Sequence, residues 1–91
     1  MFIVVSYDIV DDKRRRNVSN FLLDYGTRVQ KSVFECVVDE YRYIEIKQRI
    51  EQIIDMEDDS VRFYSICERC KDKIGVIGRG IYVTDDDIIV F

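Results

Sequence analysis

The chain has 91 residues, of which 47% are hydrophobic and 35% are charged, and its formal net charge is −4. This length suits one domain, which we expect over residues 1–91, and leaves no room for a second core. The sequence contains no histidine, which excludes Ser-His-Asp and Cys-His catalytic systems and histidine-ligated metal sites. No apolar run approaches the length of a membrane-spanning helix, so we expect no membrane partner.

The net negative charge argues against a nucleic-acid partner, but the distribution of charged residues along the chain does not. Residues 13–31 hold six bases against one acid, Asp24. Because phosphate binding depends on the local basic surface more than on the total charge, this segment is a candidate nucleic-acid surface.

The first two predicted elements are a strand and a helix. Residues 2–8 are β-branched and aromatic, which is typical of a buried central strand. They follow no basic segment and precede no cleavage site, so they predict a strand and not a signal peptide. With three cysteines, an odd number, and no export signal, we expect a cytoplasmic protein. Asp11 and Asp12 suit a helix start, and Gly26 suits its stop; the apolar positions between them are Val18, Phe21, Leu22 and Tyr25.

The rest of the chain continues the alternation of strands and helices. Residues 28–39 show a strand pattern with Phe34, Cys36 and Val38 on one face. A second helix is predicted from about residue 41 to residue 54, followed by strands at 61–67 and 81–84 and an apolar end at 88–91. We interpret this order as an α+β fold, a ferredoxin-like βαββαβ sandwich with a C-terminal strand extension.

Asp8 is the sharpest candidate for chemistry. It ends the first predicted strand at the rim of the sheet, where active groups are often presented. Mg²⁺ prefers oxygen ligands and needs only one or two protein carboxylates when phosphate supplies the others. A twofold axis near the strand end would bring two copies of Asp8 together as such a pair. The alternative is that Asp8 caps the loop or the helix start.

Two basic clusters are candidate phosphate contacts. The run Lys13-Arg14-Arg15-Arg16 circles the first helix, so one or two of its side chains would face the Asp8 rim. Its alternative role is a solvated helix face. Arg28, Lys31 and Phe34 combine bases with an aromatic ring, which fits backbone binding with base stacking. The alternative for Phe34 is ordinary sheet core.

The cysteines and glycines carry weaker signals. Cys67 and Cys70 form a CxxC pair, but the only other cysteine is Cys36, and half of a zinc site needs a second half. The pair follows a predicted strand, whereas a redox pair favours a helix N-terminus. A core cysteine and a loop cysteine are the expected roles. No glycine pattern of a phosphate-binding loop is present.

The opening third of the chain, with Tyr7-Asp8-Ile9, Asp11-Asp12, a helix ending in Tyr25-Gly26 and the segment 28–35, closely resembles the CRISPR-associated protein two family, the small partner of the spacer integrase. The resemblance covers the whole chain in length and element order. It implies a ferredoxin-like homodimer whose sheets face each other, with the family's metal-binding aspartate at Asp8 and its supporting tyrosine at Tyr7. It also implies arginines within Arg14, Arg15 and Arg16 and the strand pair Arg28 and Phe34 at the nucleic acid.

Three functions remain open from the sequence. The first is a magnesium-dependent endonuclease on single-stranded RNA or double-stranded DNA, in which two Asp8 carboxylates share the ion. The second is a non-catalytic DNA-binding scaffold that bridges integrase dimers. The third is a small-molecule-binding regulatory domain of the same fold, for which no salt-dependent nucleic-acid binding is expected.

Overall fold

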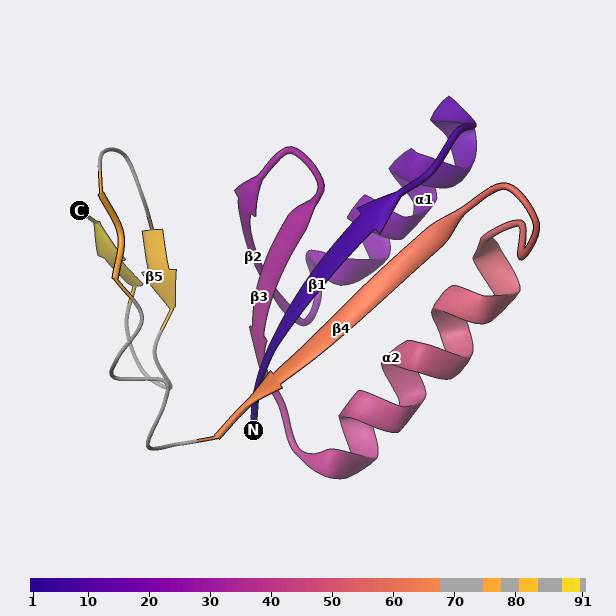
Figure 1. Cartoon of the computed structure of the whole chain (residues 1–91). Coiled ribbons are helices and arrows are strands. Elements are labelled where there is room, and N and C mark those ends of the chain that lie inside the picture. Colours follow the sequence, from indigo (N-terminus) through magenta and orange to yellow (C-terminus); the bar gives the residue numbers. More distant parts are fainter. Residues whose placement is uncertain (68–74, 78–80, 84–87, 91) are drawn as a thin grey trace.

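The computed structural model describes residues 1–67, 75–77, 81–83 and 88–90. Within them lie a four-stranded antiparallel sheet of order β2-β3-β1-β4 and a separate hairpin of β5 and β6. The elements are β1 (Phe2–Asp8), α1 (Asp12–Leu22), β2 (Gly26–Gln30), β3 (Val33–Val37), α2 (Glu40–Ile53), β4 (Ser60–Ile66), β5 (Ile81–Val83) and β6 (Ile88–Val90). Figure 1 shows α1 and α2 on the same side of the sheet. The predicted ferredoxin-like α+β fold is confirmed.

The alternation of side chains along β1 sets the two faces of the sheet. Ile3, Val5 and Tyr7 point toward the helices and are buried in the main core. Val4, Ser6 and Asp8 therefore point to the opposite face, which neither helix covers (Figure 1). The covering helices contribute Val18 and Leu22 from α1 and Ile46 and Ile50 from α2, as their apolar spacing predicted.

The helix starts follow from two aspartates. The Asp11 carboxylate accepts a hydrogen bond from the backbone N–H of Arg14 at 2.9 Å and forms the N-cap of α1. Asp39 caps α2 in the same way through the N–H of Arg42, at 2.7 Å. No helix in the described part of the chain is long and apolar enough to cross a membrane.

The segment 28–39 differs from the single strand that its pattern predicted. The chain turns at Lys31 and Ser32, so that β2 and β3 form a hairpin. Alternation alone does not reveal this turn, because residues on both sides of it keep β-type side chains. The prediction that Phe34 and Cys36 share a buried face is confirmed, since both side chains are fully buried.

Gly26 does not stop the first helix, which ends at Leu22 and has its C-cap at Leu23. It begins β2 and pairs with Cys36 of β3. A Cβ atom at this position would overlap the Glu35 carbonyl oxygen and the Cys36 Sγ. The glycine is therefore required by the close approach of two strands and not by a helix end.

The predicted strand at residues 81–84 is observed as β5, which lies near β2 and β3. The apolar end of the chain contains β6. Cys67 is exposed, whereas Cys70 and the acidic residues 85–87 lie outside the described residues. The CxxC prediction is therefore not tested by the structure.

Candidate active site at the end of the first strand

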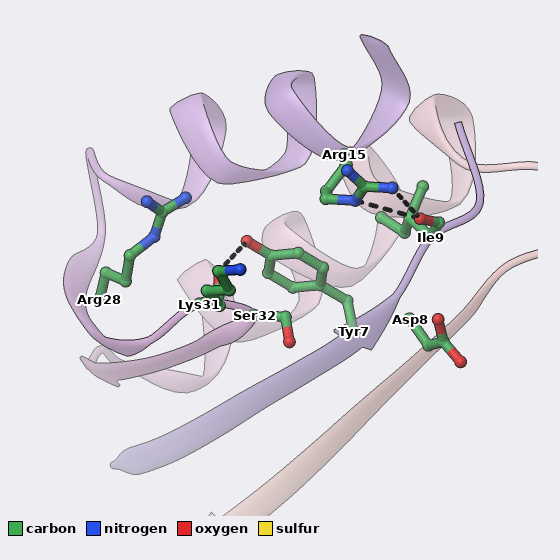
Figure 2. A pocket seen from close by; sticks show the side chains of 7 residues that line it. All are labelled: Tyr7, Asp8, Ile9, Arg15, Arg28, Lys31 and Ser32. Carbon is green, nitrogen blue, oxygen red and sulfur yellow. Dashed lines mark hydrogen bonds between the residues drawn. The ribbon is translucent and has the colours of Figure 1, made fainter. Parts of the chain in front are cut away.

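Asp8 is the last residue of β1 and is exposed. Its neighbour across the ladder is Ser60 of β4. In the described part of the chain its carboxylate accepts no hydrogen bond and forms no ion pair, and the capping of α1 is performed by Asp11 instead. Figure 2 shows the Asp8 carboxylate pointing away from the side chains of Tyr7 and Arg15. The position therefore leaves the carboxylate free for a ligand on the uncovered face of the sheet.

Tyr7 faces the other way and fixes the end of β1 in place. It is only 4% exposed, and its ring stacks against Phe34 with 6.3 Å between the ring centroids. Its hydroxyl donates to the Lys31 carbonyl oxygen at 3.4 Å, and its backbone N–H donates to the Ser32 carbonyl oxygen at 3.0 Å. These contacts tie the strand that carries Asp8 to the turn between β2 and β3.

Arg14 is held by an ion pair with a buried acid. Its Nε lies 2.8 Å from Oδ2 of Asp59, whose side chain is fully buried. Asp59 also accepts from the backbone N–H of Val10 at 3.0 Å and from that of Asp55 at 2.9 Å. The hydrogen bond from Arg14 lowers the pKa of Asp59 to about 2 and raises the pKa of Arg14.

Asp59 is a residue that the sequence analysis did not single out. It lies in an acidic turn, where composition does not distinguish a buried aspartate from its solvated neighbours. The one available signal is its place immediately before a strand, at the end of the α2–β4 connection. Its hydrogen bond to Val10 ties this connection to the loop that follows Asp8.

Arg15 lies over the same loop from the side of α1. Its guanidinium donates to the Ile9 carbonyl oxygen at 3.0 and 3.2 Å, and to that of Val10 at 3.3 Å. It also pairs with Asp12 at 2.7 Å. Arg15 therefore holds the loop after Asp8 directly (Figure 2), whereas the neighbouring Arg14 holds it through Asp59.

The remaining bases line an open surface beside α1. Arg28 donates to the Ser19 Oγ and lies 5.7 Å from the centroid of the Phe34 ring. Arg16 and Lys31 are exposed, and their side chains form no hydrogen bond or ion pair with the described residues. Two open pockets of about 440 and 580 Å³ share Arg15 and Arg28. We call this surface the basic groove, defined by Arg15, Arg16, Arg28 and Lys31.

Phe34 belongs to the core. Its ring is fully buried between Tyr7 and Arg28, so it offers no exposed face on which a base could stack. The structure thus corrects the base-stacking role in favour of the core alternative. Phe34 supports the site only by holding Tyr7 and Arg28 in position.

The donors near Asp8 fit magnesium only in part. No group of three or more acidic, cysteine or histidine side chains that could hold a metal ion is present in the described ranges. Mg²⁺ keeps several waters and accepts one or two protein carboxylates together with phosphate oxygens. The free carboxylate of Asp8 supplies one such ligand, and a second copy of the chain would supply another.

The fold and the site together define a class of protein: a ferredoxin-like domain with a free carboxylate at the end of its first strand and an arginine-rich groove behind it. A family model described as CRISPR associated protein Cas2 matches residues 1–74. The chain belongs to this family.

Similar proteins agree with this assignment over nearly the whole chain. A CRISPR-associated endoribonuclease Cas2 of Chloroflexus aurantiacus is 41% identical over 85 residues, 93% of this chain and 91% of that protein. A CRISPR-associated endonuclease Cas2 of Halalkalibacterium halodurans is 34% identical and covers 100% of both chains. A chain of a solved partial Cas6-RT-Cas1–Cas2 complex has a TM-score of 0.73 and 31% identity, covering 84% of this chain and 89% of that one.

Proposed function

We propose that this protein is a magnesium-dependent endonuclease that acts as a homodimer in CRISPR spacer acquisition. The observation that carries the proposal is the Asp8 carboxylate, which is exposed, unpaired within the described residues and adjacent to the basic groove. The relatives named endoribonuclease and endonuclease support a phosphodiesterase activity.

A dimer is proposed because the uncovered face of the sheet is suited to a second copy. Neither helix lies over it (Figure 1), and it carries the half-buried side chains of Val4, Val33 and Val37 together with Tyr64, which is 50% exposed. A chain of this size gains stability by burying such a face. A twofold axis near the end of β1 would place the two Asp8 carboxylates beside each other.

Within such a dimer each residue has a defined task. The two Asp8 carboxylates would hold one Mg²⁺, which when bound supplies Lewis-acid activation of water and neutralises charge on the phosphate. Arg16, Arg28 and Lys31 bind flanking phosphates, because their donors face solvent along the basic groove. Arg14, Arg15 and Tyr7 act as positioning residues. Arg15 binds the loop after β1, and Arg14 binds Asp59, which accepts a hydrogen bond from the same loop. Tyr7 ties the end of β1 to the turn between β2 and β3.

The basic side chains of the groove suit phosphate contacts, which carry no sequence information. We therefore expect little base preference. The substrate class, single-stranded RNA or double-stranded DNA, is left to the experiment below.

The partner that we propose is the integrase subunit of the spacer-acquisition complex. The support is the likeness to a chain from a Cas1–Cas2 assembly. In such an assembly the basic groove would bind the DNA that the integrase handles.

A non-catalytic scaffold is the second candidate function. One observation favours it: the basic groove lies on the helix side of β1, whereas the Asp8 carboxylate points to the other side (Figure 2). A protein that only binds duplex phosphates would use the basic groove, and Asp8 would have no part in its function.

The deciding experiment compares wild type with Asp8→Asn, using labelled single-stranded RNA and duplex DNA with Mg²⁺ or with EDTA. We expect cleavage that requires Mg²⁺ and that falls about a hundredfold or more in Asp8→Asn, because the metal site loses both carboxylates of the dimer. Asp24→Asn, which removes an exposed acid remote from the rim, should cleave like wild type.

The control measurements are dimer size and binding of the uncleaved substrate, both of which Asp8→Asn should retain. Cleavage that survives Asp8→Asn, or a wild type that binds DNA without cutting it, would favour the scaffold.

A further inference from the structure

Arg62 lies on the strand beside Asp8, outside the basic groove. In the register of β1 and β4, Asp8 stands opposite Ser60 and Ser6 opposite Arg62. Because side chains two positions apart share a face of a strand, Arg62 points to the same uncovered face as the Asp8 carboxylate. The alternating partners Val61 and Phe63 pack against the core, which agrees with this orientation.

Asp8 and Arg62 line one common pocket. It has a volume of about 250 Å³ and is bounded by Ser6, Tyr7, Asp8, Ser60, Arg62 and Tyr64. The lining combines one carboxylate, one guanidinium and the hydroxyls of serine and tyrosine. This set of hydrogen-bond donors around a single acid suits a phosphodiester that is held beside the carboxylate.

Within a single chain, the side chain of Arg62 is accessible to a ligand. The residue is exposed, and it forms neither a hydrogen bond nor an ion pair with any of the described residues. It is also the one basic side chain that the described strands β1–β4 place on this face, where the acids are Asp8 and Glu35. Arg14 and Arg15, by contrast, are occupied by contacts within the protein.

We propose that Arg62 binds a backbone phosphate of the nucleic-acid strand whose scissile phosphate lies at Asp8. The inference rests on the proposed function and extends it: the basic groove holds the strand on the helix side of the sheet, and Arg62 holds it in the pocket that Arg62 shares with Asp8 at the end of β1. A planar guanidinium binds two phosphate oxygens at once, so lysine at this position replaces it only in part.

The test measures binding of single-stranded RNA to variants in the Asp8→Asn background, as a function of salt concentration and without cleavage. We expect Arg62→Ala to weaken binding about tenfold and to reduce the salt slope by about one, and Arg62→Lys to restore part of the loss. Arg49→Ala is the matched control, because Arg49 is exposed on α2 and carries the same charge. Equal binding by Arg62→Ala and Arg49→Ala would overturn the proposal.

A structural role for Arg62 gives a different result. Glu35 has a buried Oε1 without a hydrogen-bond partner among the described residues, and it lies on the same face. If Arg62 served only to pair with an acid across a dimer, Arg62→Ala would dissociate the dimer. The loss of RNA binding would then vanish at protein concentrations high enough to restore the dimer. Sedimentation of the same samples measures this, and that result would also overturn the proposal.

Failure of this inference is distinguishable from failure of the proposed nuclease. If cleavage depends on Asp8 but Arg62→Ala binds RNA as Arg49→Ala does, the nuclease proposal stands and only the role of Arg62 is refuted. If no cleavage depends on Asp8 but Arg62→Ala specifically weakens RNA binding, the nuclease proposal is refuted and Arg62 is supported as a phosphate contact.

Discussion

The carboxylate of Asp59 lies beneath the loop that follows Asp8 and accepts hydrogen bonds from three groups. Two of its donors are backbone N–H groups, and the third is the guanidinium of Arg14. A buried carboxylate with this many donors stays ionised, because its charge is compensated within the protein. The same contacts connect the α2–β4 turn, helix α1 and the loop after Asp8, and so fix their relative positions.

We expect Asp59→Asn to lower the melting temperature by about 5 °C or more, because the amide cannot accept from all three donors. The exposed neighbour Asp58 provides the control. Asp58→Asn should melt within a degree or two of wild type. Equal melting temperatures for the two variants would show that the buried carboxylate contributes nothing to stability.

The pKa of Asp59 also predicts a dependence of stability on pH. Its value falls from 3.8 to about 2 on folding, so the ionised form is favoured in the native state. The contribution is therefore present above pH 3.8 and is lost as the pH falls toward 2. Wild type should lose more stability across this interval than Asp59→Asn does, as measured by denaturant unfolding at several pH values; parallel curves would contradict the assignment.

At the scale of elements, the hairpin of β2 and β3 positions half of the site. It supplies Arg28 and Lys31 to the basic groove, and the carbonyl oxygens of its turn bind Tyr7. Its two strands approach so closely at Gly26 that no side chain fits there. The placement of the groove relative to β1 thus depends on a glycine that makes no contact with the site.

We expect Gly26→Ala to destabilise the protein by about 1–3 kcal/mol, because its methyl group would overlap backbone and a buried sulfur atom. Gly75→Ala should change stability by less than about 0.5 kcal/mol, since nothing lies within 4 Å of the added atom. Denaturant unfolding of both variants tests this. Similar values for the two would mean that β2 shifts freely to accept the methyl group.

At the scale of the whole molecule, the uncovered sheet face would determine whether the proposed two-carboxylate site is complete. One chain supplies one free carboxylate at the rim, and the proposed twofold axis supplies the other. Val4 lies on this face between Glu35 and Tyr64 in the strand register. Introduction of a charge at this position would be costly in a buried interface.

We expect Val4→Glu to be monomeric by analytical ultracentrifugation at micromolar concentration and to lose the magnesium-dependent cleavage. Ile44→Glu, at a position of α2 that is 52% exposed, should remain dimeric and active. A dimeric Val4→Glu would place the interface elsewhere on the molecule. Circular dichroism of both variants checks that the chain is folded.

The sequence predicted the element order and the position of Asp8 at a strand end, because those signals are local: alternation, helical spacing and an acid that follows an apolar run. The turn at Lys31 and Ser32 was missed, because alternation continues on both sides of it. The roles of Asp59 and Phe34 depend on neighbours distant in the chain, Arg14 and Tyr7, which no local pattern specifies. Three adjacent arginines likewise look equivalent in sequence, and only tertiary contacts separate Arg14 and Arg15 from the solvent-facing Arg16.

Tyr7 and Asp8 are neighbours in the chain and face opposite sides of the sheet (Figure 2). A nucleic acid that contacts the basic groove and also reaches the Asp8 carboxylate would therefore pass from the helix side of the sheet to the other face at the end of β1. Sharp bending of a short duplex costs about 1–6 kcal/mol, whereas a single strand has no such stiffness. We therefore expect flexible or already kinked strands to reach the Asp8 carboxylate more readily than straight duplexes do.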